Sequence, residues 1–93
     1  MKLHVITPTA SIFEGEVISV SLPGKSGVFQ VLNNHTAIIS TLKQGEILIE
    51  STHNISDNSK NEFIEIKDAK HILIKIKAGV AELINNELII LAE

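Results

Sequence analysis

The chain has 93 residues, a net charge of −3 and no cysteine, arginine, tryptophan or tyrosine. This length is typical of one domain, so we expect residues 1–93 to form a single domain. Without cysteine there is no thiol nucleophile, disulfide or cysteine metal site. Eight scattered lysines argue against a nucleic-acid surface. No apolar run approaches about 18 residues and no signal-peptide pattern is present, which predicts a cytosolic protein without membrane insertion.

Apolar and polar residues alternate along most of the chain, and isoleucine is the commonest residue, with 16 copies. Strict alternation predicts strands with one buried face, and β-branched side chains pack well on a pleated surface. In chain order, the clearest segments are Leu3–Val5, Val17–Leu22, Ile47–Ile49, Ile64–Ile66 and Ile72–Ile76. In the second segment, alternation places Ile18, Val20 and Leu22 on one face. Leu88–Leu91 is apolar on both faces, which predicts a central strand or one covered by a partner.

Turn-forming residues separate these segments. Gly15 marks one turn, Pro23–Gly27 is a turn-rich loop, and Asn33–Asn34 and Gly45 suit positive φ angles. Asn85–Asn86 stands between two apolar runs and predicts a two-residue hairpin of type I′. The polar stretch Ser51–Asn61 predicts a loop.

The sequence therefore predicts an all-β fold of about ten short strands. Twist and exposed edges prevent ten strands in so short a chain from staying in one flat sheet. Two sheets packed face to face, as in a β-sandwich or a flattened barrel, bury the apolar faces best.

Residues that could carry chemistry are few. The four histidines share no spacing that would gather them around a metal ion, and only His35 lies in a distinctive loop. Glu14 and Glu16 flank a predicted turn in solvent, which disfavours acid–base catalysis. Pro23–Gly27 lacks the spacing of a phosphate-binding loop. The sequence thus predicts no catalytic, cofactor or metal site, and a protein surface is the favoured ligand.

Several motifs occur in a fixed order along the chain. They are Thr7–Pro8, Phe13–Val17, Ser19–Gly24, Gly27–Ile38, Ser40–Gly45, Ala78–Leu83 and Leu88–Glu93. Their ordered combination resembles the N-terminal β-sandwich domain of the epsilon subunit of the F-type ATP synthase (delta in mitochondria). The resemblance is close over Lys2–Gly45 and Lys77–Glu93, and holds only in pattern over Glu46–Ile76.

The resemblance implies a ten-stranded β-sandwich at the foot of the central stalk, where it joins the gamma subunit to the c-ring. It implies a non-catalytic subunit that couples proton flow to ATP synthesis, without cofactor, at the cytoplasmic face of the bacterial inner membrane. The gamma-facing residues that it implies, expected to be comparatively apolar, are Thr7, His35, Ile39, Ser40 and Leu42. The c-ring-facing residues that it implies are Lys25, Ser26, Gly27, Val28 and Phe29.

Some positions depart from the family's pattern. Val28 stands where the family often has an acidic residue that faces basic loops of the c-ring. The contact cannot be an ion pair here, so either Val28 packs or a different residue serves. Gln30 replaces a usual glycine, and Asn33–Asn34 replace Pro-Gly before the histidine. The turn can survive this exchange because asparagine tolerates positive φ. For His35 two roles stay open, a partner contact and a cap of its own turn.

The chain ends where many bacterial members continue into two helices that can bind ATP and inhibit hydrolysis. We therefore expect a natural short form without the C-terminal helical domain, with no nucleotide bound. A trimmed chain is the alternative.

Two other functions stay open on the residues alone. One is a small β-sandwich binding module of another complex or of a carbohydrate, although the missing tryptophan and tyrosine argue against sugar binding. The other is a small enzyme that uses His35 with Glu14 or Glu16.

Overall fold

The computed structural model describes residues 1–54 and 63–93, which form nine strands and no helix. The strands are β1 (Lys2–Ile6), β2 (Ser11–Gly24), β3 (Gly27–Leu32), β4 (Ile38–Leu42), β5 (Gly45–Ser51), β6 (Ile64–Ile66), β7 (His71–Ile76), β8 (Gly79–Ile84) and β9 (Glu87–Ala92). The predicted all-β class is confirmed. The loop predicted over Ser51–Asn61 lies mostly outside the described residues.

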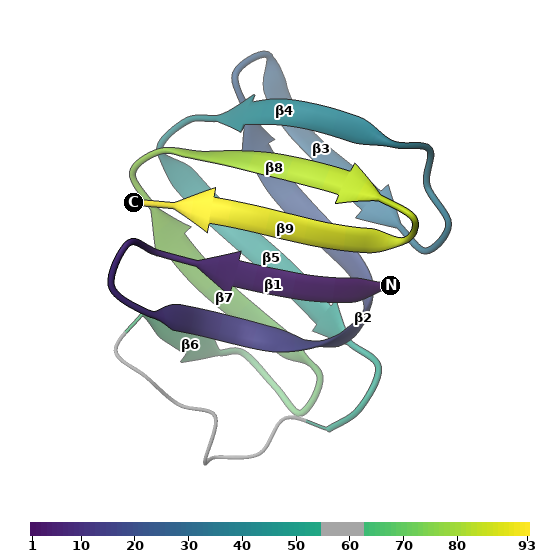
Figure 1. Cartoon of the computed structure of the whole chain (residues 1–93). Helices are drawn as coiled ribbons and strands as arrows, with labels where there is room; N and C mark the ends of the chain where they lie inside the picture. Colours follow the sequence, from purple (N-terminus) through teal and green to yellow (C-terminus); the bar gives the residue numbers. More distant parts are fainter. Residues whose placement is uncertain (55–62) are drawn as a thin grey trace.

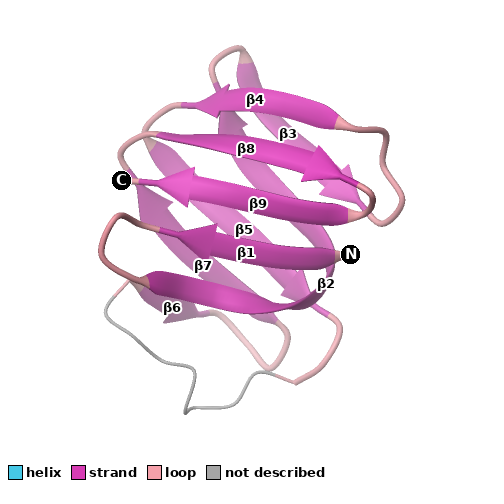
Figure 2. Ribbon diagram, in the orientation of Figure 1, coloured by secondary structure: helices cyan, strands magenta, loops and turns pink. Residues whose placement is uncertain are grey.

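Two layers of strands pack face to face and share β2 (Figure 1). The front layer has the order β4-β8-β9-β1, followed by Ser11–Glu16 of β2. The back layer has the order β3, then Val17–Gly24 of β2, then β5-β7-β6. All pairs are antiparallel except β1 with β9, and Gly24 pairs with Leu42 to join the layers at a second place. The predicted β-sandwich is therefore confirmed, and every described element is a strand or a loop (Figure 2).

Strand β2 continues through Gly15, where the sequence predicted a turn. Gly15 pairs with Leu3 of β1 inside the ladder. A Cβ on Gly15 would lie 3.4 Å from the Phe13 ring, so that ring packs over the bare backbone of the glycine. This continuity merges two of the expected short strands, and it explains why the described residues hold nine strands instead of about ten.

A β-bulge at Ile18 changes which side chains of β2 are buried. Val17 pairs with Ser51 and Ser19 pairs with Glu50, so Ile18 is an extra residue without its own partner in β5. The bulge shifts the alternation by one position, and Val17 is buried whereas Ile18 is 42% exposed. The assignment of Ile18 to the buried face was therefore wrong.

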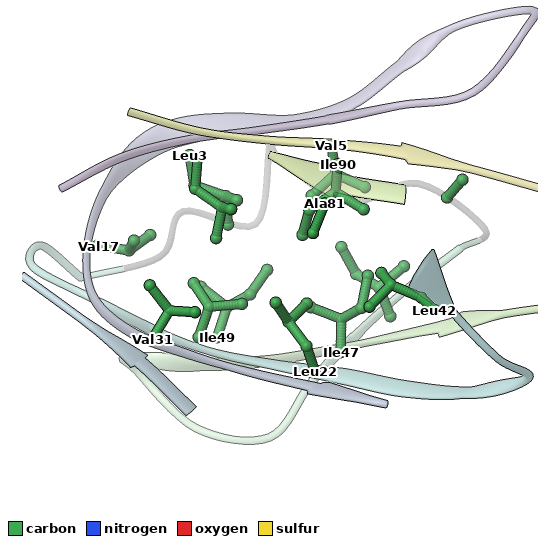
Figure 3. Packing of buried hydrophobic residues seen from close by; sticks show 14 of the residues in the cluster. Leu3, Val5, Val17, Leu22, Val31, Leu42, Ile47, Ile49, Ala81 and Ile90 are labelled. Carbon is green, nitrogen blue, oxygen red and sulfur yellow. The ribbon is translucent and has the colours of Figure 1, made fainter. Parts of the chain in front are cut away.

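The core lies between the two layers. Figure 3 shows Leu3, Val5 and Ile90 of the front layer facing Leu22 and Ile49 of the back layer. All five are fully buried. The closely packed apolar interior links both layers into one body.

Strand β9 lies in the middle of the front layer, between β1 and β8. Leu88 and Ile90 point into the core and are fully buried. On the opposite side of the strand, Leu91 is 55% exposed. Of the two alternatives predicted for Leu88–Leu91, the structure shows the central strand, and the outward side of β9 remains apolar and open.

The turn between β8 and β9 has the predicted type I′ form. Asn85 and Asn86 have φ angles of 52° and 61°, and Ile84 pairs with Glu87 directly across the turn. Both central residues of a type I′ turn need positive φ, which asparagine tolerates better than most residues. The hairpin predicted from the sequence is confirmed.

Candidate partner-binding surface

The hairpin between β2 and β3 carries the five residues expected to face the c-ring. Gly24 pairs with Gly27 across a two-residue turn, and Gly27 has a φ angle of 135°, which favours glycine. A Cβ on Gly24 would lie 2.8 Å from the Phe29 ring, so the ring packs directly on that glycine. With Phe29 turned inward, Val28 points outward and is 73% exposed.

An open groove of about 480 Å³ separates this hairpin from β4. Its lining residues are Gly24, Lys25, Ser26, Gly27, Val28, Phe29, Ile39, Ser40 and Thr41. Within the groove, Ile39 is the most exposed apolar residue of β4, at 74%. The structure thus brings Ile39 and Ser40, expected to face the gamma subunit, beside the residues expected to face the c-ring. We call this feature the β3–β4 groove.

Leu42 does not belong to that surface. It is only 2% exposed, and Figure 3 shows its side chain in the core. The reason is the pleat of β4: Ile39 and Thr41 point outward, so Ser40 and Leu42 point toward the back layer. Ser40 remains half-buried and lines the groove. A direct partner contact by the Leu42 side chain is therefore not supported.

Apolar side chains also line the outward side of the front layer. Val80 of β8 pairs with Leu91 of β9, and Leu91 pairs with Ile6 of β1, so the three side chains form a row across three strands. Beside this row lies a hollow of about 560 Å³ that Thr7 and Pro8 also line. We call Ile6, Val80 and Leu91 the outer apolar row. Sequence reasoning missed it as a surface, although the apolar character of both sides of β9 was the signal.

Thr7 and His35 lie at opposite ends of the front layer. Thr7 follows β1 and shares its hollow with Gly79, where β8 begins. His35 precedes β4, and the adjacent Asn34 donates its N–H to Asn86 Oδ1 at 2.8 Å, where β8 ends. The outward side of the front layer therefore lies between Thr7 at one end and His35 at the other.

Local hydrogen bonds fix the conformations around both residues. Thr7 N–H donates to the Ala10 carbonyl at 2.8 Å, and Thr7 Oγ1 donates to the same oxygen at 3.2 Å. His35 N–H donates to the Leu32 carbonyl at 3.1 Å, and its Nδ1 lies 2.8 Å from the Thr36 carbonyl, which requires a proton on Nδ1. His35 thus caps its own loop while its side chain stays exposed, so a partner contact remains open.

A second set of bonds attaches the His35 loop to the β8–β9 turn. Asn86 Nδ2 donates to Asn33 Oδ1 at 2.9 Å, and that oxygen also accepts from the Met1 amine at 2.8 Å. The Asn33–Asn34 pair that departs from the family's pattern therefore has a structural role. Asn34 has a φ angle of 63°, as its sequence position predicted.

Charged residues gather on the front layer at the same end as the β8–β9 turn. His4 Nε2 lies 2.9 Å from Glu87 Oε2, and His4 Nδ1 lies 3.9 Å from Glu14 Oε2. Glu16 lies 3.3 Å from the Met1 amine. Within residues 1–54 and 63–93, neither Glu14 nor Glu16 is hydrogen-bonded to His35. The geometry therefore does not support an enzyme that uses His35 with one of these two carboxylates.

Metal-binding clusters and membrane-spanning helices are both absent from the described residues. No group of three or more histidine, aspartate or glutamate side chains there could hold a metal ion. No helix in those two ranges is long and apolar enough to cross a membrane. What the surface offers chemically is apolar contact area, strand edges and a few charges, which suit a protein partner.

Known proteins share both the sequence pattern and the fold. The family model described as ATP synthase, Delta/Epsilon chain, beta-sandwich domain matches residues 1–93. The chain is 37% identical over 93 residues to the ATP synthase epsilon chain of Campylobacter jejuni serotype O:23/36, and 33% identical over 92 residues to that of Chlorobium limicola. It spans 60% of the length of the Campylobacter protein and 88% of the Chlorobium protein.

Two solved structures show the same fold at low identity. One is a chain of the Tetrahymena thermophila mitochondrial ATP synthase central stalk and c-ring, with a TM-score of 0.71 and 16% identity over 99% of this chain and 62% of that one. The other is a chain of the Euglena gracilis mitochondrial ATP synthase, with a TM-score of 0.73 and 17% identity over 97% and 48%. Because the family model covers every residue, this chain belongs to the β-sandwich domain family of ATP synthase delta and epsilon chains.

Proposed function

We propose that this chain is a non-catalytic central-stalk subunit of an F-type ATP synthase, which links the gamma subunit to the c-ring and couples proton translocation to ATP synthesis. The observation that carries the proposal is the family match over residues 1–93. In this role the chain is held at the cytoplasmic face of the bacterial inner membrane by its partners, without cofactor or nucleotide.

The gamma subunit covers the outward side of the front layer in this proposal. Thr7, Ile39 and His35 border that side, and the outer apolar row lies between them. Apolar side chains at the centre of an interface contribute most when a partner excludes water from them. The proposed contact therefore keeps Thr7, His35, Ile39 and Ser40, adds the outer apolar row and leaves out Leu42.

The c-ring contacts the tip of the β2–β3 hairpin in this proposal. Lys25, Ser26 and Gly27 form the exposed tip, and Val28 is the exposed apolar residue behind it. Because the hairpin lies across the β3–β4 groove from Ile39, both partners contact adjoining parts of one side of the molecule. Torque then passes through β2, which belongs to both layers.

The direct test measures binding of the labelled chain to the gamma–c-ring subcomplex of the same organism. Ile39→Asp should weaken binding by at least about tenfold, because a carboxylate at an apolar interface loses its hydration without a partner. Ile18→Asp is the matched control, since Ile18 is also exposed but lies at the bulge of the back layer.

The outcomes separate the proposal from its rival. Retention of the wild-type chain and of the Ile18 variant, with loss of the Ile39 variant, supports the central-stalk role. If the folded wild-type chain is not retained at all, the role is wrong and a binding module of another complex becomes the better explanation.

A further inference from the structure

We propose that the β3–β4 groove binds a partner loop that presents an apolar side chain beside a carboxylate. The inference rests on the proposed central-stalk function and specifies the chemistry of the partner at this place. Three independent features of the groove lead to it: its apolar walls, its unpaired strand edges and its charge.

The apolar walls come from two different layers. Val28 of the back layer and Ile39 of the front layer are the two most exposed large hydrophobic residues of the described chain, and both line the groove. An apolar side chain inserted between them would remove both from water at once. Exposed apolar residues that gather in one groove mark an interaction site more strongly than isolated ones.

On the β3 side, the strand edge offers free backbone groups. The Pro23 carbonyl accepts the Lys43 N–H at 2.9 Å, so this carbonyl faces away from β3. Val28 is the register partner of Pro23, and in an antiparallel ladder it turns its N–H and C=O away from β2 in the same way. No strand among the described residues lies beyond that edge.

On the β4 side, the hydrogen-bonding pattern leads to the same result. The two-residue turn makes Ile84 and Glu87 a hydrogen-bonded pair, so the backbone N–H and C=O of Ile84 face β9. Because this direction alternates along β8, the backbone N–H and C=O of Ala81 and Leu83 face β4. They bond the register partners Ser40 and Ile38 there. The N–H and C=O of Ile39 therefore face the open edge, where an extended partner segment can bond them.

The charge of the groove defines the third feature. Lys25 is the only charged residue among the nine that line it, and no aspartate or glutamate is among them. Lys43 follows β4 and is bonded through its backbone to the base of the hairpin. Glu82, the register partner of Ile39, lies on the neighbouring strand outside the lining. A partner carboxylate therefore complements this groove, whereas a basic loop would meet an uncompensated lysine.

The first experiment measures binding of charge variants to the gamma–c-ring subcomplex. Lys25→Glu should weaken binding by about tenfold or more, because like charges across an interface repel, and Lys25→Gln should weaken it less. Lys70→Glu makes the same charge change on an exposed lysine of the β6–β7 turn and should leave binding within about twofold. Equal or tighter binding of Lys25→Glu would overturn the proposal.

A second measurement uses the chain alone, so it decides the groove chemistry even if the subcomplex does not bind. The ¹⁵N-labelled chain is titrated with a capped peptide of sequence Gly-Asp-Leu-Asp-Gly, and with Gly-Lys-Leu-Lys-Gly as its basic counterpart. The acidic peptide should shift the amide signals of Val28 and Ile39 and lose this effect in Lys25→Glu. Larger shifts with the basic peptide, or no shifts with either, would contradict the inference. Failure of the proposed function alone would instead show as peptide binding without retention by the subcomplex.

Discussion

At the residue scale, Ile39 and Leu42 of β4 show how the pleat separates two similar side chains. Leu42 is packed in the core and Ile39 stands in solvent. Leu42→Ala should lower the free energy of unfolding by about 2–5 kcal/mol, because it removes buried methyl groups and leaves a cavity. Ile39→Ala should change it by no more than about 0.5 kcal/mol. Urea denaturation of both variants checks this, and similar losses in the two would contradict the orientation of β4.

Asp68 provides a second residue-scale prediction, in the turn between β6 and β7. Its Oδ1 accepts the backbone N–H groups of Lys70 and His71 at 2.9 Å, and the His71 ring nitrogen lies 2.8 Å away. The Lys70 N–H bond is the main reason that the pKa of Asp68 is lowered, and the His71 side chain adds to it. The ionised carboxylate therefore favours the folded state.

The sign of the pH effect follows from that lowered pKa. The stabilisation is complete above the unfolded pKa of the carboxyl group and is lost as pH falls through its folded pKa. Asp68→Asn should therefore be less stable than the wild type at neutral pH, and the difference should shrink as the solution is acidified. Denaturation curves at a series of acidic pH values measure it. A difference that does not depend on pH would show that the charge of Asp68 is not involved.

At the scale of elements, the bulge in β2 makes a prediction about neighbouring residues. Ile18→Thr should leave stability within about 0.5 kcal/mol, since Ile18 is 42% exposed and lies outside the core. Val20→Thr should cost about 1–3 kcal/mol, because it places a hydroxyl in the core without a partner. Thermal or urea unfolding distinguishes them. Without the bulge, Ile18 and Val20 would share the buried side and both changes would be costly.

The same elements show what the sequence could predict. Alternation identified most strands because it reflects one buried face, as at Ile47–Ile49 and Ile72–Ile76, where the isoleucines are buried. Asn85–Asn86 identified its turn because few residues adopt positive φ twice in succession. The passage of β2 through Gly15 and the bulge at Ile18 were not predictable, because both depend on which strands lie beside β2.

The candidate surface was predictable to a lesser extent. The resemblance selected residues by position along the chain, and two of them, Val28 and Ile39, are exposed in the structure. It could not separate Ile39 from Leu42, since both are apolar and only the pleat distinguishes them. It also could not indicate that the β2–β3 hairpin and β4 line a common groove, because that contact joins residues of two different layers.

At the scale of the whole molecule, β2 makes the two layers one cooperative unit. Its first half pairs with β1 and its second half with β3 and β5, and Val17 at the crossing is buried. If either layer opened, β2 would lose half of its ladder, and the shared core would be exposed to water. The layers should therefore unfold together.

Native-state hydrogen exchange tests this cooperativity. The slowest amides of β1 and β9 in the front layer should exchange with the same opening free energy as those of β5 and β7 in the back layer. Val17→Ala should lower both values equally, by about 2 kcal/mol, since it removes two buried methyl groups where the layers meet. If the variant lowers protection in one layer only, the layers open separately. In that case β2 alone would not hold the two layers together as one cooperative unit.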